Sequence, residues 1–326
     1  MKILVTGASG FIGRSLCLDL QASGFSVRAV MRRTSSGVGE YECCYGALDD
    51  ENFLLKVLEG IDVVIHLAGR AHQLGRASND LEAMLDVNKR LTLELASYAA
   101  KAGVKRFVFV SSIGVNGVET GAEPVDELSE VNPVKDYAVS KHQAELGLAE
   151  RYATNERTME LVIVRPPLVY AGNAPGNFQR LLKLVDLGVP LPFSGVHNKR
   201  SMISLNNFTD FLKTCAVHPD ARGQLFLVSD GEDLSLPEII RGLALGMGRK
   251  SRLFYFPVPV MFMLSNILGK RALMTQLCGS FVLNSGKART RLNWTPPFSS
   301  REELLKAARD YKLASEVHSL KSAQSE

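Results

Sequence analysis

The sequence predicts an α/β fold, with a doubly wound parallel sheet followed by a smaller C-terminal domain. Short, β-branched apolar runs alternate with amphipathic helical patterns, which is typical of parallel strands covered by helices on both faces. The runs lie at 2–6, 26–31, 62–67, 106–111 and 161–165, and the helical patterns lie at 11–23, 79–102 and 136–153. After Pro166 the alternation stops, and glycine and proline become frequent. We therefore expect a first domain over 1–165, to which some later segments return, and a second domain over 166–314.

The first run leads into a glycine-rich turn that opens the first helix. The turn contains Gly7, Gly10 and Gly13, with Phe11 and Ile12 between the last two. The first glycine permits a positive φ in a tight turn, the second lets backbone N–H groups approach a ligand, and the third lets helix and strand pack closely. Because this pattern stands between a strand and a helix, it predicts a site for the pyrophosphate of a dinucleotide.

The second run ends in Met31 and is followed by Arg32 and Arg33. An acidic side chain at this position binds the adenosine ribose hydroxyls of NAD, whereas an arginine can pair with the 2′-phosphate of NADP. The sequence therefore favours NADP(H) over NAD(H), with Arg32 as the phosphate ligand. The alternative is that both arginines are solvated loop residues.

The third run ends in Leu67 and Ala68, which we expect to lie along the edge of the dinucleotide. His66, inside this run, is more typical of a hydrogen-bonded core residue than of a catalyst. Asn88, in the next helical pattern, is a polar residue that can hold main-chain groups near the site.

A candidate proton-transfer site follows from the fourth run and the helix after it. Ser112 comes at the end of the fourth run, where ligands of open α/β sheets bind. Tyr137 and Lys141 are four residues apart, so they project from one face of a helix. We expect the ammonium of Lys141 to lower the pKa of Tyr137, which would make the phenol a useful acid or base. The alternative is a chance pair on a surface helix.

Two later segments lead to expectations about membrane binding and about the C-terminal end of the chain. The apolar run 253–268 contains Pro257 and Pro259 and is too short to span a bilayer, so we expect it to pack within the second domain. A helix lying on a membrane surface is the alternative. The segment 315–326 is polar, and we expect it to be a frayed tail.

Composition and charge exclude several classes of protein. The chain has 326 residues, of which 46% are apolar and 22% charged, as in soluble globular proteins. Its net charge of +4 comes from dispersed basic residues and gives no argument for nucleic-acid binding. Five cysteines without metal-ligand spacing predict reduced thiols and no metal site. No charged leader precedes the first run, so we expect no signal peptide and a cytoplasmic location.

These motifs together resemble the extended short-chain dehydrogenase/reductase family, in its nucleotide-sugar epimerase, dehydratase and reductase branch. The resemblance is carried by the glycine turn, His66-Leu67-Ala68, Ser111-Ser112, Tyr137 to Lys141 and Arg165-Pro166-Pro167, which occur in the family's order. It implies a Rossmann-type domain with a nicotinamide cofactor that Pro166 also contacts, and a smaller C-terminal substrate-binding domain for a UDP-sugar. It also implies a homodimer through the helices at 79–102 and 136–153.

Departures from the family's pattern narrow the expected chemistry. Where the family's 4,6-dehydratases carry an acidic pair, this chain has Ile113-Gly114, so dehydration is not expected. Ala47 replaces an acid associated with adenine recognition, and Leu168 replaces an asparagine associated with uridine contact. Recognition of the nucleotide is therefore expected to differ from the usual arrangement.

Three residues are candidates for binding the substrate's diphosphate, together with Ser112 for the sugar. Arg200 matches a family arginine before a short strand, and its planar guanidinium suits paired phosphate oxygens. Asn177 opens a helical stretch, where it either binds the diphosphate or caps the helix. Arg271 is a third candidate. A surface salt bridge is the alternative for Arg200.

The resemblance extends to bacterial surface-polysaccharide reductases that act on UDP-4-keto-6-deoxy-N-acetylhexosamines. It implies reduction of a C4 keto group, in which Tyr137 supplies the proton and Lys141 and Ser112 assist. A UDP-hexose or UDP-N-acetylhexosamine 4-epimerase, using the same three residues, is the alternative. A non-catalytic NADP-binding regulator is a further alternative, although it would not require Ser112, Tyr137 and Lys141.

Overall fold

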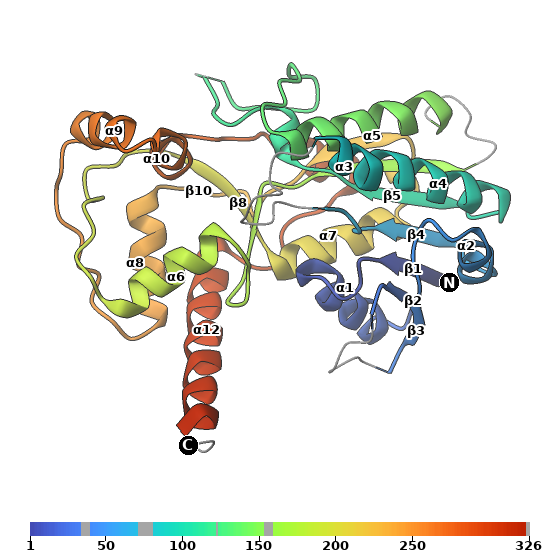
Figure 1. The fold of residues 1–326 in the computed structure, drawn as a ribbon, viewed down its shortest axis with the longest axis horizontal. Helices are drawn as coiled ribbons and strands as arrows, with labels where there is room; N and C mark the ends of the chain where they lie inside the picture. Colours follow the sequence, from blue (N-terminus) through green and yellow to red (C-terminus); the bar gives the residue numbers. More distant parts are fainter. Residues whose placement is uncertain (34–39, 71–80, 122, 153–158, 324–326) are drawn as a thin grey trace.

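The computed structural model describes residues 1–33, 40–70, 81–121, 123–152 and 159–323. Its main feature is a seven-stranded parallel sheet with the strand order β3-β2-β1-β4-β5-β6-β9 (Figure 1). The strands are β1 (Lys2–Thr6), β2 (Ser26–Met31), β3 (Glu42–Tyr45), β4 (Val63–His66), β5 (Arg106–Val110), β6 (Glu160–Arg165) and β9 (Gln224–Leu227). The order reverses between β1 and β4, as in doubly wound nucleotide-binding sheets. This confirms the predicted α/β fold class.

Helices cover both faces of this sheet. On one face lie α1 (Phe11–Ala22), α7 (Leu205–Val217) and α11 (Gly286–Leu292), and on the other lie α2 (Glu51–Leu58), α4 (Leu91–Lys101) and α5 (Asp136–Tyr152). The side chains of each strand alternate between these two faces: Ile3 and Val5 of β1 pack on the α1 face, and Leu4 packs on the α2 face. Together the two faces form the core of the large sheet. Both faces are buried, so the strands are almost continuously apolar.

The five predicted strands and the helices at 11–23 and 136–153 agree with the structure to within about one residue. The helix at 79–102 differs, and α2 and β3 were not predicted. The helix predicted at 79–102 is α3 (Leu81–Leu85), a π-helical turn (Asp86–Arg90) and α4; residues 79 and 80 lie outside the described residues, as does the predicted last residue of α5, Ala153. The sequence of the edge strand β3, Glu-Cys-Cys-Tyr, has no apolar alternation, and its side chains are only partly buried.

A second core lies beside the large sheet. It includes a three-stranded sheet in the order β10-β8-β7, formed by β7 (Leu168–Tyr170), β8 (Arg200–Ser204) and β10 (Asp233–Leu234). Around it pack α6 (Asn177–Leu187), α8 (Leu236–Gly246), α9 (Val258–Ile267), α10 (Arg271–Cys278) and α12 (Ser300–Ala323). The chain crosses between the two regions more than once, because α7, β9 and α11 return to the large sheet. The domain boundary at residue 165 stays a prediction.

The structure corrects the expectation of a frayed tail, because α12 continues as a helix to Ala323. The start of α12 is well determined: Ser299 and Glu302 exchange hydrogen bonds between side chain and backbone in a capping box. Leu304, Ala307 and Ala308 are then buried against the second core. The capped and packed first turns allow the polar continuation to extend the helix.

The apolar run 253–268 is only half packed. Its helix, α9, buries Met261 and Ser265, whereas Met263 and Ile267 are 57% and 74% exposed. The expected packing into the second core therefore holds for one face of the helix and fails for the other. Among the described residues, no helix is both long and apolar enough to cross a membrane.

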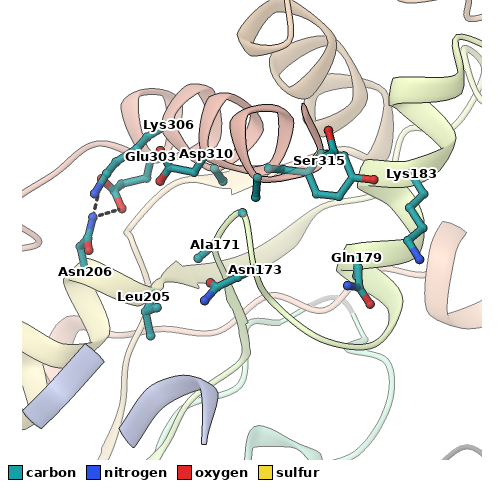
Figure 2. Close-up of a pocket in the computed structure, with 14 residues that line it drawn as sticks. Ala171, Asn173, Gln179, Lys183, Leu205, Asn206, Glu303, Lys306, Asp310 and Ser315 are labelled. Atoms are coloured by element: carbon teal, nitrogen blue, oxygen red, sulfur yellow. Dashed lines mark hydrogen bonds between the residues drawn. The ribbon is translucent and has the colours of Figure 1, made fainter. Parts of the chain in front are cut away.

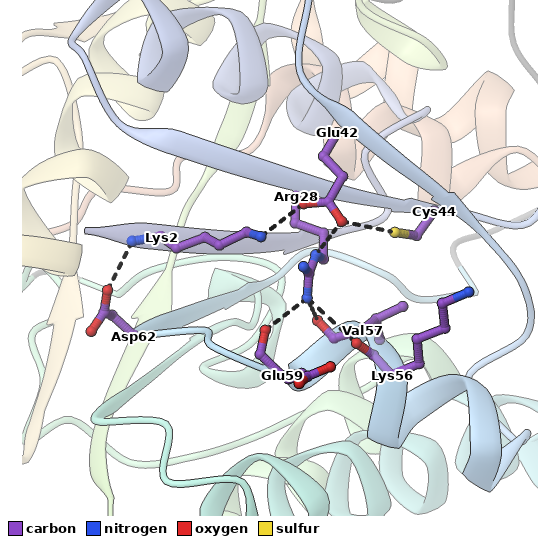
Figure 3. A network of polar contacts seen from close by, with 8 residues as sticks. All are labelled: Lys2, Arg28, Glu42, Cys44, Lys56, Val57, Glu59 and Asp62. Carbon is purple, nitrogen blue, oxygen red and sulfur yellow. Dashed lines mark hydrogen bonds and ion pairs between the residues drawn. The ribbon is translucent and has the colours of Figure 1, made fainter.

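A polar network holds the edge of the large sheet together (Figure 3). Arg28 of β2 donates from Nη1 to the carbonyl oxygens of Val57 (2.7 Å) and Glu59 (2.9 Å), at the C-terminus of α2. Its Nε donates to Glu42 of β3 at 2.8 Å, and Glu42 also pairs with Lys2 of β1 at 2.9 Å. A cation at a helix C-terminus is favourable, so Arg28 fixes α2 against three adjacent strands.

Candidate active site

The glycine turn after β1 forms a close-packed cradle. Gly7 has a φ of 68°, and a Cβ added to it would lie 2.8 Å from the backbone nitrogen of Ala68. A Cβ on Gly13 would overlap the carbonyl oxygen of Gly7. The turn therefore requires glycine at both positions, and it brings Leu67 and Ala68 against the start of α1.

The N-terminus of α1 suits an anionic group. Gly10 is the N-cap residue, and no side chain caps the helix. The first N–H groups of a helix have no partner within it, so those of Phe11, Ile12 and Gly13 are the donors that a pyrophosphate would need. The residues present thus fit a dinucleotide, as predicted from the sequence.

The end of β2 lacks the carboxylate that usually binds ribose hydroxyls. β2 ends at the buried Met31, and Arg32 and Arg33 are exposed directly after it. The next acidic residue in the sequence is Glu40. Arg32 is therefore accessible to a 2′-phosphate, and its role as the ligand stays a prediction.

Ser112 lies in the turn after β5, close to the start of α5. Its Oγ accepts a hydrogen bond from the backbone N–H of Gly114 at 3.1 Å. A Cβ on Gly114 would lie 3.3 Å from that Oγ and 3.5 Å from the Cβ of Ala138, the residue after Tyr137. The N–H of Ile113 donates to the carbonyl oxygen of Pro166 at 3.0 Å. Ser112, the first turn of α5 and Pro166 therefore gather at the carboxyl ends of β5 and β6.

Lys141 reaches under this region from the second turn of α5. It is 3% exposed, its Nζ donates to the carbonyl oxygen of Val110 at 2.9 Å, and the same atom lies 4.7 Å from the centre of the Phe109 ring. A Cβ on Gly69 would lie 3.4 Å from Nζ, so the lysine also reaches the loop after β4. Burial lowers the pKa of Lys141 to about 8, because the ammonium loses its water.

Tyr137 differs from the sequence-based expectation in its titration. Burial raises the pKa of Tyr137 to about 12, whereas the expectation was that Lys141 would lower it. The physical reason is that the surrounding protein desolvates the phenolate. At neutral pH the structure therefore holds Tyr137 as a protonated phenol, which is the form that donates a proton.

The sequence analysis missed Ser140, which supports this site from the same helix. Ser140 is fully buried, and its Oγ donates to the carbonyl oxygen of Tyr137 at 2.8 Å while accepting from Nδ2 of Asn88 at 2.9 Å. Asn88, in the π-helical turn, also holds both the N–H and the carbonyl of Arg70, at 2.7 and 3.1 Å. The sequence does carry a signal for this role. Ser140 lies between Tyr137 and Lys141 on one helix, and a serine inside a helix can hydrogen-bond to a backbone carbonyl of the preceding turn.

His66 is a core residue with a defined hydrogen-bond order. Thr92 donates to the carbonyl oxygen of Asn88 at 2.8 Å, so Nε2–H of His66 donates to Thr92 at 2.9 Å. Nδ1 of His66 then accepts from Thr6 at 2.7 Å, and Thr6 accepts from the N–H of Ala68 at 3.3 Å. Burial lowers the pKa of His66 to about 3, so the ring stays neutral and positions the loop after β4.

The three diphosphate candidates lie on elements around the three-stranded sheet, and no contact between them is seen among the described residues. Arg200 begins β8 and donates from Nη1 to the carbonyl oxygen of Gly279 at 2.9 Å, and burial lowers its pKa. Asn177 begins α6 and accepts from Arg180 at 3.3 Å, while Arg271 is exposed at the start of α10. Their roles as substrate ligands stay predictions.

A cavity of about 630 Å³ lies elsewhere, between the β7–α6 loop, α7 and α12 (Figure 2). Its wall includes Lys183, Lys306 and Asp310, together with Asn206, whose Nδ2 donates to Glu303 at 2.8 Å. No residue of the predicted site lines this cavity. We assign it no role in the chemistry discussed below.

Replacing Lys141 with methionine is expected to stabilise the protein at neutral pH while removing its activity. The folded pKa of about 8 is below the usual value of 10.5, so folding disfavours the ammonium at pH 7. The stability advantage of Lys141→Met should be largest below pH 8 and should shrink as the pH rises toward 10.5, where both states of wild type lose the proton. Urea unfolding of both proteins at pH 7 and 10 measures it; a destabilised variant at pH 7 would contradict the expectation.

Comparison with known proteins agrees with this geometry. Residues 3–185 match the family described as the NAD dependent epimerase/dehydratase family. The chain is 34% identical over 316 residues to a UDP-glucose 4-epimerase of Vibrio cholerae, covering 95% of each chain.

A second relative comes from Escherichia coli O157:H7 and is named N-acetyl-alpha-D-glucosaminyl-diphospho-ditrans,octacis-undecaprenol 4-epimerase; it is 28% identical over 83% of this chain and 82% of its own. The crystal structure of a UDP-glucuronic acid 4-epimerase from Bacillus cereus in complex with NAD superposes with a TM-score of 0.75, at 24% identity and over 96% of each chain, which supports the fold. From the matched family and the Vibrio cholerae relative, the chain belongs to the NAD dependent epimerase/dehydratase family.

Proposed function

We propose that the protein is an NAD(P)-dependent oxidoreductase acting at C4 of a UDP-activated sugar, and that it reduces the 4-keto group of a UDP-4-keto-6-deoxy-N-acetylhexosamine. The observation that carries the proposal is the gathering of Ser112, Tyr137 and Lys141 at the carboxyl ends of β5 and β6, beside the glycine cradle after β1. Ligands of open α/β sheets bind at this edge. A hydroxyl, a phenol and a lysine are the groups that a carbonyl reduction needs.

Each residue has one role in the proposed reduction. The nicotinamide cofactor supplies the hydride that C4 receives. Ser112 donates a hydrogen bond to the carbonyl oxygen and polarises it. Tyr137 transfers its proton to the same oxygen, so one hydride and one proton convert the ketone into an alcohol. Lys141, which is close to Val110 and Gly69, contacts the cofactor ribose.

One observation supports the reductive direction. Arg32 rather than an acid follows β2, which favours NADP(H), the cofactor used as a reductant. Ile113-Gly114 next to Ser112 supplies no acid that could expel a hydroxyl, so the proposal does not include dehydration.

The second candidate function is 4-epimerisation, and the relatives favour it. The Vibrio cholerae and Escherichia coli relatives are both named 4-epimerases, one of UDP-glucose and the other of a sugar on diphospho-undecaprenol. An epimerase would use Ser112, Tyr137 and Lys141 to oxidise C4 and then to reduce it from the other face, without net consumption of cofactor. Its substrate is a UDP-hexose, a UDP-N-acetylhexosamine or the corresponding polyprenyl diphosphate sugar.

One assay separates the candidates. Purified protein is incubated with UDP-4-keto-6-deoxy-GlcNAc and either NADPH or NADH, and loss of the reduced cofactor is compared with product formation. One cofactor oxidised per alcohol formed supports the reductase. Interconversion of UDP-GlcNAc and UDP-GalNAc, or of UDP-glucose and UDP-galactose, without added cofactor would replace it by the epimerase. Cofactor binding with neither activity would indicate a regulator.

Arg32→Asp is expected to reverse the cofactor preference. The substitution removes a cation that would pair with the 2′-phosphate and adds an acid that can bind ribose hydroxyls, so KM for NADPH should rise by about tenfold or more. Arg33→Asp is the matched control, with the same change of charge one residue later. Equal effects of both substitutions would show a general electrostatic contribution and would contradict the specific role of Arg32.

The remaining proposals concern the ligands of the substrate's diphosphate, the oligomeric state and the cellular role. We propose Arg200 and Asn177 as ligands of the UDP diphosphate, with Arg271 as a third. We also propose a cytoplasmic homodimer, formed through α4 and α5, that serves the synthesis of bacterial surface polysaccharide. The KM of Arg200→Met for the UDP-sugar tests the diphosphate site. The size of the purified protein in solution tests the homodimer.

A further inference from the structure

The distribution of charge along the chain is strongly uneven around α9 and α10. Residues 239–301 contain ten lysines and arginines and no aspartate or glutamate. The rest of the chain has 28 basic and 34 acidic residues, so without this segment it would be net negative. A basic segment without acids is attracted to anionic surfaces.

Within this segment, α9 is apolar on two sides, and only one is covered. Met261 and Ser265 face the second core and are 7% and 6% exposed. Elsewhere on the helix, Met263, Leu264, Ile267 and the C-cap residue Leu268 are 57%, 44%, 74% and 69% exposed. A helix that is apolar all round is normally enclosed by protein or lipid. We name these four exposed residues the α9 patch.

Basic side chains frame the α9 patch in sequence on both sides. Lys250 and Arg252 precede the helix, and Lys270 and Arg271 follow it; all four are exposed. Their side chains make no ion pair with the part of the chain that the structure describes. Figure 1 shows α9 and α10 at the opposite end of the molecule from the edge strand β3.

We propose that the α9 patch docks the protein on the surface of a bilayer that contains anionic phospholipid. The helix would lie in the interface, with the α9 patch among the acyl chains and Lys270, directly after it, at the headgroups. Charge complementarity favours this occupant over an apolar protein partner, because the apolar residues and an excess of unpaired positive charge occur together. This inference is independent of which reaction the enzyme catalyses.

Vesicle co-sedimentation tests the proposal directly. The full-length protein is mixed with vesicles of phosphatidylglycerol and phosphatidylethanolamine, or of phosphatidylcholine alone, at about 0.1 M salt and again at about 1 M, where charges are screened beyond ~3 Å. We expect binding to the anionic vesicles, weakened at high salt and on phosphatidylcholine. The double variant Met263→Ser/Ile267→Ser should lower the partition coefficient at least about tenfold, and Lys270→Gln, which removes the cation directly after the α9 patch, should lower it about fivefold.

Matched controls separate docking from general effects of the substitutions. Leu187→Ser removes an apolar side chain of α6 that is 72% exposed, and Lys56→Gln removes an exposed cation of α2; neither should change binding. Circular dichroism and activity without vesicles should be unchanged in all variants. Wild type that stays in the supernatant, or Ser variants that bind like wild type, would overturn the proposal. So would an oligomer that the Ser variants dissociate, because the α9 patch would then join two copies.

Discussion

Tyr137→Phe is expected to lower kcat by about 10²–10⁴-fold, the usual contribution of a positioned general acid or base. The substitution removes one oxygen and keeps the ring, so the packing around the first turn of α5 should persist. The pKa of about 12 places the proton on Tyr137 at neutral pH, and its loss removes the group that would protonate the substrate oxygen. Steady-state kinetics with the substrate identified by the assay above measures the effect.

Tyr152→Phe is the control for this substitution. Tyr152 is the last residue of the same helix, is 8% exposed and packs in the core behind the sheet rather than at the site. It should keep kcat within about twofold, since an exchange that leaves the reacting groups in place has no reason to alter the chemical step. If both variants lost activity equally, the effect would come from α5 as a whole and the proposed role of Tyr137 would be wrong.

Arg165→Met is expected to lower the free energy of unfolding by about 3–5 kcal/mol, because it leaves a buried carboxylate without its cation. Arg165, at the end of β6, donates to both carboxylate oxygens of Glu145 on α5, at 2.9 and 2.5 Å, and to Oδ1 of Asn116 at 2.9 Å. Both members of the pair are about 95% buried. Urea unfolding measures the loss, and because α5 carries Tyr137, activity should fall with it.

Two comparisons make this prediction specific. Arg165→Met combined with Glu145→Leu removes both charges and should recover most of the lost stability. Lys105→Met breaks an exposed pair with Asp62 at 2.9 Å and should cost at most about 1 kcal/mol. A double variant as unstable as Arg165→Met alone would show that packing, and not the isolated carboxylate, accounts for the loss.

The first half of the fold was predictable because its signals are local. A parallel strand buried on both faces is mostly apolar, and β1 and β6 show this in the consecutive apolar residues 3–5 and 161–164. The glycine turn was predictable for a similar reason, since the positive φ of Gly7 and the contact of Gly13 with the Gly7 carbonyl both arise within the turn. The strand β3 was not, because an edge strand of four partly exposed residues needs little apolar sequence.

The features that escaped prediction depend on contacts between distant segments. Ser140 acquires its partner Asn88 from a helix 52 residues earlier in the chain. The direction of the Tyr137 pKa shift depends on how much water the fold removes from the phenol. The half-covered state of α9 depends on the second core, which covers Met261 and leaves Ile267 outside.

The π-helical turn Asp86–Arg90 has a consequence for the evolution and engineering of this enzyme. A π-turn accommodates one residue more than an α-helix of the same rise, so the helices before and after it are out of phase by about one residue. This phase difference lets Asn88 face α5 while Thr92 and Leu95 face the sheet. Deleting one residue there would restore a regular helix and turn either Asn88 or the sheet-facing residues away by about 100°. Without the extra residue, Asn88 could not keep its contact with α5 while Thr92 and Leu95 keep theirs with the sheet.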